Sequence, residues 1–301
     1  MQIKHILAAL GLPPLGLADS TGPHSWCGIG APSEQTSKDL DSLRAFEIAS
    51  RPSIWIQQQT INIPIHLHGV LDPDADSESI TAESLRAQFD VMNQAYGPYG
   101  IQFTLLTMDR VTDSRLANFN TSFFGDPETD QYRLDYLKTT RKGDYSELNI
   151  WLYTSLGDGL NGVCTLPQAN YPVEELWRDG CHIAAGTMPG GDRERYNVGF
   201  TAVHETGHWL GLLHPWGDGG GDGDGDCDGD GDRVDDTPPQ SMPVFGCPST
   251  PQNSCPGRTG VDNADNYMDY ADDTCYDGQK FTVGQQIRMH SSYTQLRSVR
   301  R

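Results

Sequence analysis

The sequence predicts an α+β fold in which a mixed, twisted β-sheet is backed by one helix and followed by a second helix rich in histidine. Three runs have the alternating or apolar pattern of strands, at residues 61–70, 101–108 and 147–154. A segment with helical spacing, residues 81–97, lies between the first two. The order strand, helix, strand, strand is typical of a mixed sheet with a helix on one face.

The first strand and the first helix have the clearest local signals. In "INIPIHLHGV", Ile or Leu at alternate positions is separated by polar or small residues, which is the period of two that strands show. In "TAESLRAQFDVMNQAYG", Leu85, Phe89 and Met92 recur at helical spacing. Thr81 and Ser84 are suited to cap the start of that helix.

The N-terminal region differs in composition from the rest of the chain. Residues 1–18 have a basic start, a short apolar run broken by two prolines, and small residues near the end, which together predict a secretory signal peptide. Residues 19–55 are rich in Ser, Pro and Gly around Cys27, and contain one helical pattern at 37–49. We interpret them as a prosegment or N-terminal arm. Seven cysteines fit the oxidising environment of a secreted, extracellular protein, with one cysteine left over after pairing.

The charge balance limits the classes of partner. The chain has 41 acidic and 21 basic residues, giving a formal net charge of -20. Nucleic acids and anionic membranes are therefore poor partners. The acidity either keeps a secreted protein soluble or binds cations. We expect a monomer that binds neither nucleic acid nor membrane. Asn120, in "NTS", is a candidate glycan acceptor.

The stretch "TAVHETGHWLGLLHPW", residues 201–216, predicts a zinc site. His204 and His208 lie one helical turn apart, so both imidazoles point from one face and can form half of a tetrahedral site. Gly211 lets the backbone leave the helix, so that His214 can return as the third ligand. A lone histidine is usually a structural residue, but the whole pattern HExxHxxGxxH rarely arises by chance. We therefore expect one zinc ion per chain.

Three protein ligands leave a fourth position for water, which is typical of a catalytic zinc. Zinc lowers the pKa of bound water toward about 7. Glu205, adjacent to the first ligand, can take the proton of that water and pass it to a leaving amine. The predicted reaction is hydrolysis of peptide bonds in proteins or peptides. Two alternatives remain: a non-catalytic zinc or calcium scaffold, against which the presence of Glu205 argues, and a hydrolase of non-peptide amides.

The segment "HETGHWLGLLH" resembles the zinc signature of the metzincin metallopeptidases, and "NYMDY", residues 266–270, resembles their Met-turn. Within that clan the chain is similar to the pappalysin branch, especially its secreted fungal and microbial members. The matching words "DDTPPQ", "GCP", "SCPG", "NYMDYADDTC" and "FTVGQQIRM" extend the similarity over most of residues 197–290. The sequence departs from that pattern at Pro215, where threonine is more usual, and in a longer "YDGQK" segment.

The resemblance implies a two-lobed catalytic domain over residues 56–301. The upper lobe would reach about residue 214, and the lower lobe, 215–301, would be irregular, with the Met-turn and a C-terminal helix. Substrate would lie as an added antiparallel strand along an edge strand, for which "NGVCTLP", residues 161–167, is the candidate.

The resemblance also implies roles for individual residues. Met268 would lie under the zinc, and Tyr270 would ligate zinc or hydrogen-bond the oxyanion of the intermediate. Asp273 would be the counter-ion for Arg or Lys after the cut bond, the alternative being a solvated or calcium-binding aspartate. Cys27 would be the fourth zinc ligand of a latent zymogen, the alternative being an intermolecular or fourth structural disulfide. The arm would be cut near Arg51.

The disulfide pairing is likewise implied by the resemblance, because six cysteines allow many connectivities. The implied pairs are Cys247 with Cys275, Cys227 with Cys255, and Cys164 with Cys181.

Residues 217–232, "GDGGGDGDGDCDGDGD", form an acidic low-complexity segment that cannot pack a core. Part of it fits a calcium loop, but a second register fits almost as well, and a solvated flexible loop is the alternative. The resemblance separately implies structural calcium nearby. The candidate calcium ligands are Asp224, Asp226, Asp228, Asp235, Asp236 and Thr237.

Overall fold

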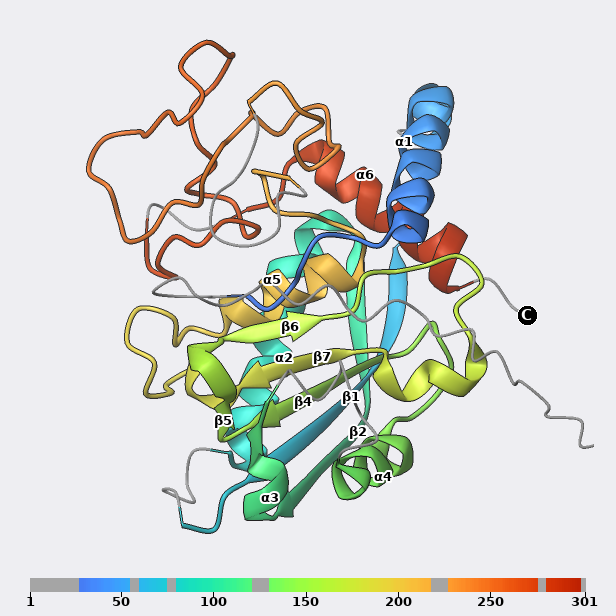
Figure 1. Ribbon diagram of the computed structural model, residues 1–301, viewed down its shortest axis with the longest axis vertical. Coiled ribbons are helices and arrows are strands. Elements are labelled where there is room, and N and C mark those ends of the chain that lie inside the picture. Colours follow the sequence, from blue (N-terminus) through green and yellow to red (C-terminus); the bar gives the residue numbers. More distant parts are fainter. Residues whose placement is uncertain are drawn as a thin grey trace, which may run out of the picture.

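The computed structural model describes residues 27–54, 60–74, 80–120, 130–217, 227–275 and 280–298. The predicted signal peptide, Asp224, Asp226 and most of "YDGQK" lie outside these residues. In Figure 1 the main sheet has five strands in the order β2-β1-β4-β7-β6. Their bounds are β1 Ile61–Leu71, β2 Ile101–Thr112, β4 Leu148–Tyr153, β6 Gly162–Cys164 and β7 Cys181–Ala184.

The sheet is mixed, as predicted. β1 runs parallel to β2 and β4, and β4 runs parallel to β7, whereas β6 is antiparallel to β7 and forms one edge. The three predicted strands are present. β2 continues four residues beyond the predicted end at 108, because its pairing with β1 continues to Thr112 opposite Leu71. A second, two-stranded ladder joins β3 (Asn118–Phe119) to β5 (Ser155–Leu156).

Two helices cover one face of the sheet. α2 (Ala82–Tyr96) begins with the predicted capping arrangement, in which Thr81 and Ser84 exchange side-chain to backbone hydrogen bonds. α5 (Phe200–Trp209) packs against α2, β6 and β7. The largest core cluster fills the space between these helices and β1 and β4. Burial on this scale is the main favourable contribution to folding and fixes α5 against the sheet.

The opposite face carries a second apolar cluster and short helices that the sequence analysis did not predict. They are short and only weakly amphipathic, which explains the omission. Their bounds are α3 Ser114–Ala117, α4 Gln131–Thr140 and the 3-10 helix η5 Val173–Arg178. Other 3-10 helices are η1 Gly97–Tyr99, η4 Gly157–Gly159 and η6 Ala185–Thr187.

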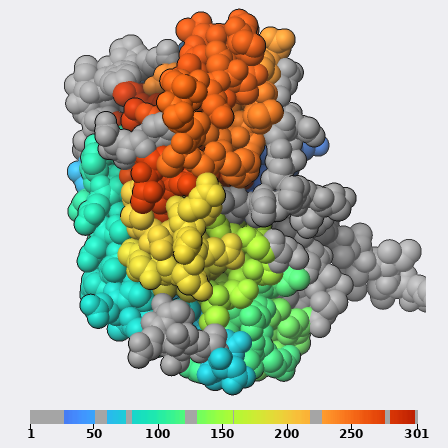
Figure 2. Space-filling model, turned by 90° about the vertical axis from the view of Figure 1, so that its left-hand side faces the viewer, coloured from blue at the N-terminus to red at the C-terminus, as the bar shows by residue number. Residues whose placement is uncertain are grey.

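Beyond His214 the described chain is mostly irregular until α6 (Val283–Ser292) and the π-helix η7 (Tyr293–Arg297). Figure 2 shows its orange residues gathered at one end of the molecule, with green residues toward the other end. Two disulfides cross-link this region, and a third joins β6 to β7. The bonded pairs are Cys227–Cys255, Cys247–Cys275 and Cys164–Cys181, the same pairs that the resemblance implied.

The N-terminal arm packs on this framework. Its helix α1 (Glu34–Ile54) is longer than the predicted 37–49 and lies beside α6 (Figure 1). Leu40 and Leu43 are buried, and Glu47 forms a buried ion pair with Arg288 of α6 (Nε to Oε1, 2.8 Å). None of the helices in the described part of the chain has the length and apolar character needed to cross a membrane.

Candidate metal centre

The helix α5 carries the predicted histidines into the interior. Residues 201–209 are all buried, because the sheet covers one side of the helix and the irregular C-terminal region covers the other. At its end Gly211 adopts a φ of 90°, a left-handed conformation that glycine tolerates without a Cβ clash. Hydrogen bonds from Gly211 N to His208 O (2.8 Å) and from Leu212 N to Gly207 O (2.9 Å) hold this turn. The turn brings His214 back toward the helix.

The three histidines meet with the spacing that a tetrahedral zinc ion requires. Their Nε2 atoms lie 3.0 Å (His208 to His204), 3.2 Å (His208 to His214) and 3.3 Å (His214 to His204) apart. Zn–N bonds of about 2.05 Å at tetrahedral angles place ligand nitrogens about 3.3 Å apart. The three imidazoles therefore fit one zinc ion.

Hydrogen bonds fix the tautomer that a metal ligand needs. His204 Nδ1 donates to Tyr267 O (2.7 Å), and His208 Nδ1 donates to Leu212 O (2.8 Å). Each Nε2 lone pair is then directed at the common centre. Burial lowers the pKa of His208 to about 4 and the pKa values of His204 and His214 well below the usual range. All three imidazoles are consequently neutral at physiological pH and able to coordinate.

Cys27 supplies a fourth corner. Its Sγ lies 3.6 Å from His208 Nε2, and the four ligand atoms all lie within 4.8 Å of one another. A Zn–S bond of about 2.3 Å predicts an S to N distance of about 3.6 Å. Burial and the nearby Glu205 carboxylate raise the pKa of the thiol in the metal-free protein, so its ionisation depends on the cation. Cys27 lies outside the three disulfides of the described chain.

The arm reaches this corner along the edge of the sheet. Cys27 forms a parallel bridge with Gly162 of β6, and Gly28 N donates to Gly162 O (2.9 Å). The segment predicted as a substrate edge, 161–167, thus contains β6, the edge strand of the sheet, and the arm pairs with it at Gly162.

Glu205 lies beside the metal position and is fully buried. Burial raises its pKa to about 8, while the Cys27 thiol and the backbone of Cys164 act in the opposite direction. Its side chain occupies the space above Gly162, where a Cβ would lie 2.5 Å from Glu205 Cγ. Gly162 was not identified from the sequence, because a glycine in a short strand has no local signal of such a contact.

Met268 lies against the opposite side of α5. A Cβ on Gly207 would lie 2.5 Å from its Sδ, so the helix and the methionine are in direct contact. Asn266 shapes the turn: its Oδ1 accepts from Met268 N (2.9 Å) and its carbonyl oxygen accepts from Asp269 N (3.0 Å). Tyr270, two residues on, has its hydroxyl 3.1 Å from His214 Nε2. The phenol thus points at the metal position.

The acidic pair after the turn is buried. Asp273 Oδ2 accepts from Val198 N (2.9 Å), just before the start of α5, and burial raises its pKa to about 7. Asp272 forms an ion pair with the largely exposed Arg195 (Oδ2 to Nε, 2.7 Å).

The described calcium candidates do not converge as the histidines do. Asp228 and Asp235 pair with Arg258 and Arg44, and Asp236 accepts hydrogen bonds from Thr282 Oγ1 and Gly284 N. Thr237 is buried. Asp232, which was not among the candidates, is buried with a pKa raised to about 7, and its Oδ2 makes no hydrogen bond within the described residues. Within its described residues, 227–232, the acidic segment thus holds the buried carboxyl group of Asp232, whose pKa shift the neighbouring Thr237 side chain opposes.

Comparison with known proteins decides the family. The model of the peptidase M43 family, described as pregnancy-associated plasma protein-A, matches residues 132–294. The chain belongs to the peptidase M43 family. An extracellular metalloprotease of Sordaria macrospora is 39% identical over 99% of both chains, and one of Neurospora crassa is 39% identical with the same coverage.

Solved structures with more than 25% sequence identity share the fold. Mature mirolysin of Tannerella forsythia in complex with a cleaved peptide has a TM-score of 0.60 and 27% identity, covering 80% of this chain and 96% of that one. A promirolysin mutant has a TM-score of 0.62 and 26% identity, covering 90% of this chain and 95% of that one. The predicted metzincin fold is confirmed, and the chain is a zinc metalloprotease with the His204, His208 and His214 triad and Glu205.

Proposed function

We propose that this M43 protease is an extracellular endopeptidase in which Glu205 is the general base and Tyr270 stabilises the oxyanion. The observation that carries the proposal is the tetrahedral spacing of three imidazole nitrogens beside a buried carboxyl group. Zinc held by the three histidines supplies Lewis acidity and an activated water. Glu205 takes the proton of that water and delivers it to the leaving amine, while the Tyr270 hydroxyl donates a hydrogen bond to the developing oxyanion.

Degradation of casein tests this function. The arm-released protein should cleave casein, lose the activity on treatment with a chelator, and regain it on addition of one equivalent of zinc. A scaffold protein would bind zinc without cleaving casein, and a hydrolase of non-peptide amides would leave casein intact. Either result would remove the endopeptidase proposal.

We also propose that substrate pairs antiparallel with β6. The hydrogen bond from Gly28 N to Gly162 O supports this, since the backbone of an extended segment there donates to the edge of β6. The arm pairs in the parallel sense, which is opposite to the sense proposed for substrate. The arm would then lie along β6 in the direction opposite to the one proposed for substrate.

The arm, residues 19–55, is proposed to be a prosegment that follows the 1–18 signal peptide and keeps a monomeric zymogen latent through Cys27. The Sγ position at the fourth corner of the site supports this role. The promirolysin structure covers 90% of this chain and mature mirolysin 80%, a difference of the size that an arm present only in the precursor would produce. The cut would fall near Arg51, within the last turns of α1 and before the catalytic domain, 56–301.

Replacing Cys27 with alanine should activate the uncut protein. We expect at least about tenfold more peptidase activity than uncut wild type, because a tethered thiolate competes with water at an effective concentration near millimolar. The measurement is cleavage of a quenched fluorescent peptide by full-length protein, with the arm shown intact by mass spectrometry. Equal latency of both proteins, or a disulfide mapped to Cys27, would exclude the switch.

Asp273 is proposed to select Arg or Lys after the cut bond. Its buried carboxyl group has a raised pKa, so a basic substrate side chain would stabilise the charged form. Asp273→Asn should lower kcat/KM about 10- to 100-fold for a peptide with Arg at that position, the value of a charge-assisted hydrogen bond, and little for one with Leu. A cleavage-site map dominated by aliphatic residues there would contradict the assignment.

Structural calcium is proposed near residues 228–237. Asp232 is the strongest support, because its buried carboxyl group has a raised pKa although Val234 N donates to Oδ1, and a hard cation bound to oxygen ligands would stabilise the charged form. Equilibrium dialysis that detects no calcium in the mature protein would remove the proposal.

A further inference from the structure

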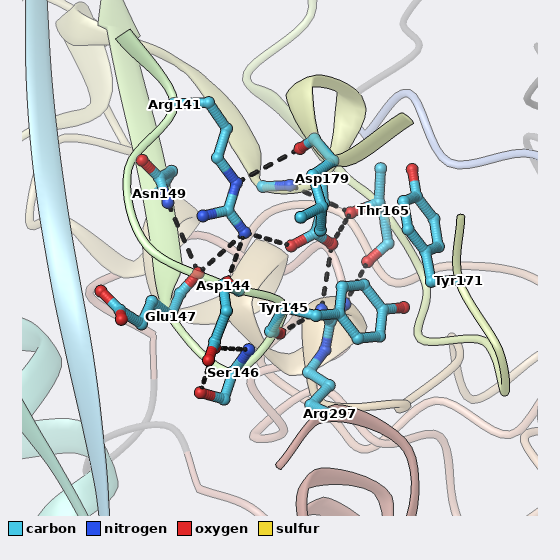
Figure 3. A network of polar contacts seen from close by, with 12 residues as sticks. Arg141, Asp144, Tyr145, Ser146, Glu147, Asn149, Thr165, Tyr171, Asp179 and Arg297 are labelled. Carbon is cyan, nitrogen blue, oxygen red and sulfur yellow. Dashed lines mark hydrogen bonds and ion pairs between the residues drawn. The ribbon is translucent and has the colours of Figure 1, made fainter. Parts of the chain in front are cut away.

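A buried charge network lies outside the catalytic groups (Figure 3). Asp179, immediately before β7, is fully buried and forms ion pairs with two buried arginines from different parts of the chain. Arg141 Nη2 lies 3.2 Å from Asp179 Oδ2, and Arg297 Nη1 lies 3.0 Å from Oδ1. Burying three charges is costly, and apolar side chains of similar volume often stabilise a protein equally well. A contribution to stability alone therefore does not account for this network.

Arg297, in η7 near the C-terminal end of the chain, contacts both the end of α5 and the residue that follows β6. Its Nε donates to Trp209 O (2.7 Å), and its guanidinium lies 3.7 Å from the centre of the Trp209 ring. Trp209 is the last residue of α5 and follows the ligand His208 directly. Nη2 of Arg297 donates to Thr165 O (3.3 Å), directly after β6. One rigid guanidinium thus joins the zinc-binding helix to the edge strand.

Asp179 makes the same two connections from its own side. Its Oδ1 accepts from Thr165 Oγ1 (2.9 Å), and its Oδ2 accepts from Trp209 Nε1 (3.4 Å). Thr165 N also donates to Gly180 O (3.1 Å), which anchors the end of β6 to the residue after Asp179. Because a guanidinium has fixed donor directions, these contacts fix the distance between the end of α5 and the end of β6.

We propose that the Asp179–Arg297 pair sets the separation between β6 and α5, and that Arg297 is a positioning residue for extended substrates. The proposal rests on the pairing of substrate with β6. The gap has little tolerance, because the Glu205 side chain fills it against Gly162. A small shift of β6 displaces a paired substrate from the metal and from Glu205, while the three histidines on and after α5 keep their spacing.

Arg297→Lys in the zinc-loaded, arm-released enzyme tests the proposal. Lysine keeps the charge but loses the fork that bonds Trp209, Thr165 and Asp179 together. We expect kcat/KM for an eight-residue peptide to fall about tenfold or more, and the Ki of a peptide hydroxamate to rise similarly. Zinc content and the Ki of acetohydroxamate, which reaches zinc but not β6, should stay within about twofold, since a small ligand does not depend on strand position.

Arg141→Lys is the matched control. It weakens an ion pair of the same Asp179 carboxylate. The other hydrogen bonds of Arg141 go to backbone carbonyl groups at residues 142, 144, 147 and 176, and not to α5 or β6. The Tm of Arg141→Lys should fall, whereas its Ki for the peptide hydroxamate should stay close to that of wild type. Thr165→Val removes the hydroxyl bond to Asp179 and the bond that the hydroxyl accepts from Gly180 N. It replaces Arg297→Lys if that variant does not fold, and should shift the Ki of the peptide hydroxamate in the same direction. The proposal would be overturned if Arg141→Lys lost as much peptide affinity as Arg297→Lys and Thr165→Val. It would also be overturned if kcat/KM and Ki for the peptide ligands did not change in the latter two variants.

A backbone-methylated peptide separates this proposal from the one on which it rests. If wild type cleaves peptides methylated at the amides that face β6 as fast as the parent peptide, the strand pairing is wrong, and the positioning role fails with it. If wild type discriminates between them and Arg297→Lys has wild-type constants for both, the pairing stands and the role of Arg297 alone is overturned.

Discussion

Glu205→Gln is expected to remove peptide hydrolysis while leaving the zinc site filled. Glutamine has nearly the same shape, but its amide cannot accept and return the proton of the attacking water. A positioned general base contributes about 10²- to 10⁴-fold to the rate, so kcat should fall by that factor with KM little changed. The measurement is turnover of a fluorescent peptide by the arm-released enzyme, with zinc determined by elemental analysis.

Stability provides a second readout for the same variant. In the metal-free protein, burial raises the pKa of Glu205 to about 8 from an ordinary value near 4.5. A raised carboxyl pKa contributes stability that is present at low pH and is lost as the pH rises through about 8. Glutamine cannot ionise, so the metal-free variant should unfold at a higher temperature than wild type above pH 8.

Peptidase activity of Glu205→Gln within tenfold of wild type would mean that another group is the base.

The strands and the zinc motif could be predicted because their signals are local. Alternation in residues 61–70 and helical spacing in 81–97 each occupy one short window, and His204 and His208 are neighbours on one helix face. Helix geometry alone is enough to infer that these two imidazoles lie side by side. The same is true of Gly211, whose place after the helix predicts the turn that brings back His214.

The remaining site features depend on contacts between distant segments. Cys27 lies 181 residues from His208 in sequence, so only a family resemblance connected the two. Arg297 and Asp179 are separated by 118 residues, and neither has a pattern that marks it as buried. The acidic segment was ambiguous for a different reason, since an alternating Gly-Asp tract fits several registers. Asp232 emerged only from its burial in the fold.

Gly162→Ala is expected to impair catalysis severely. The added Cβ would lie 2.5 Å from Cγ and 2.8 Å from Oε1 of Glu205, closer than unbonded atoms can approach. The closest atom is the Cγ of a fully buried side chain, so the glutamate must shift and its carboxyl group leaves the position beside the metal. Because a displacement of about 1 Å at a reacting group costs about 10²-fold, kcat should fall by about that factor.

Gly257→Ala is the control for the substitution itself, because Gly257 is exposed and a Cβ there meets no atom within 4 Å. A double-mutant cycle with Glu205→Gln then identifies the mechanism. If Gly162 acts by making room for the general base, adding Gly162→Ala to the glutamine variant should lower kcat by less than about twofold, since the base is already absent. Independent losses that multiply would instead place the effect of Gly162 on substrate pairing with β6, and the spatial argument for Glu205 would fail.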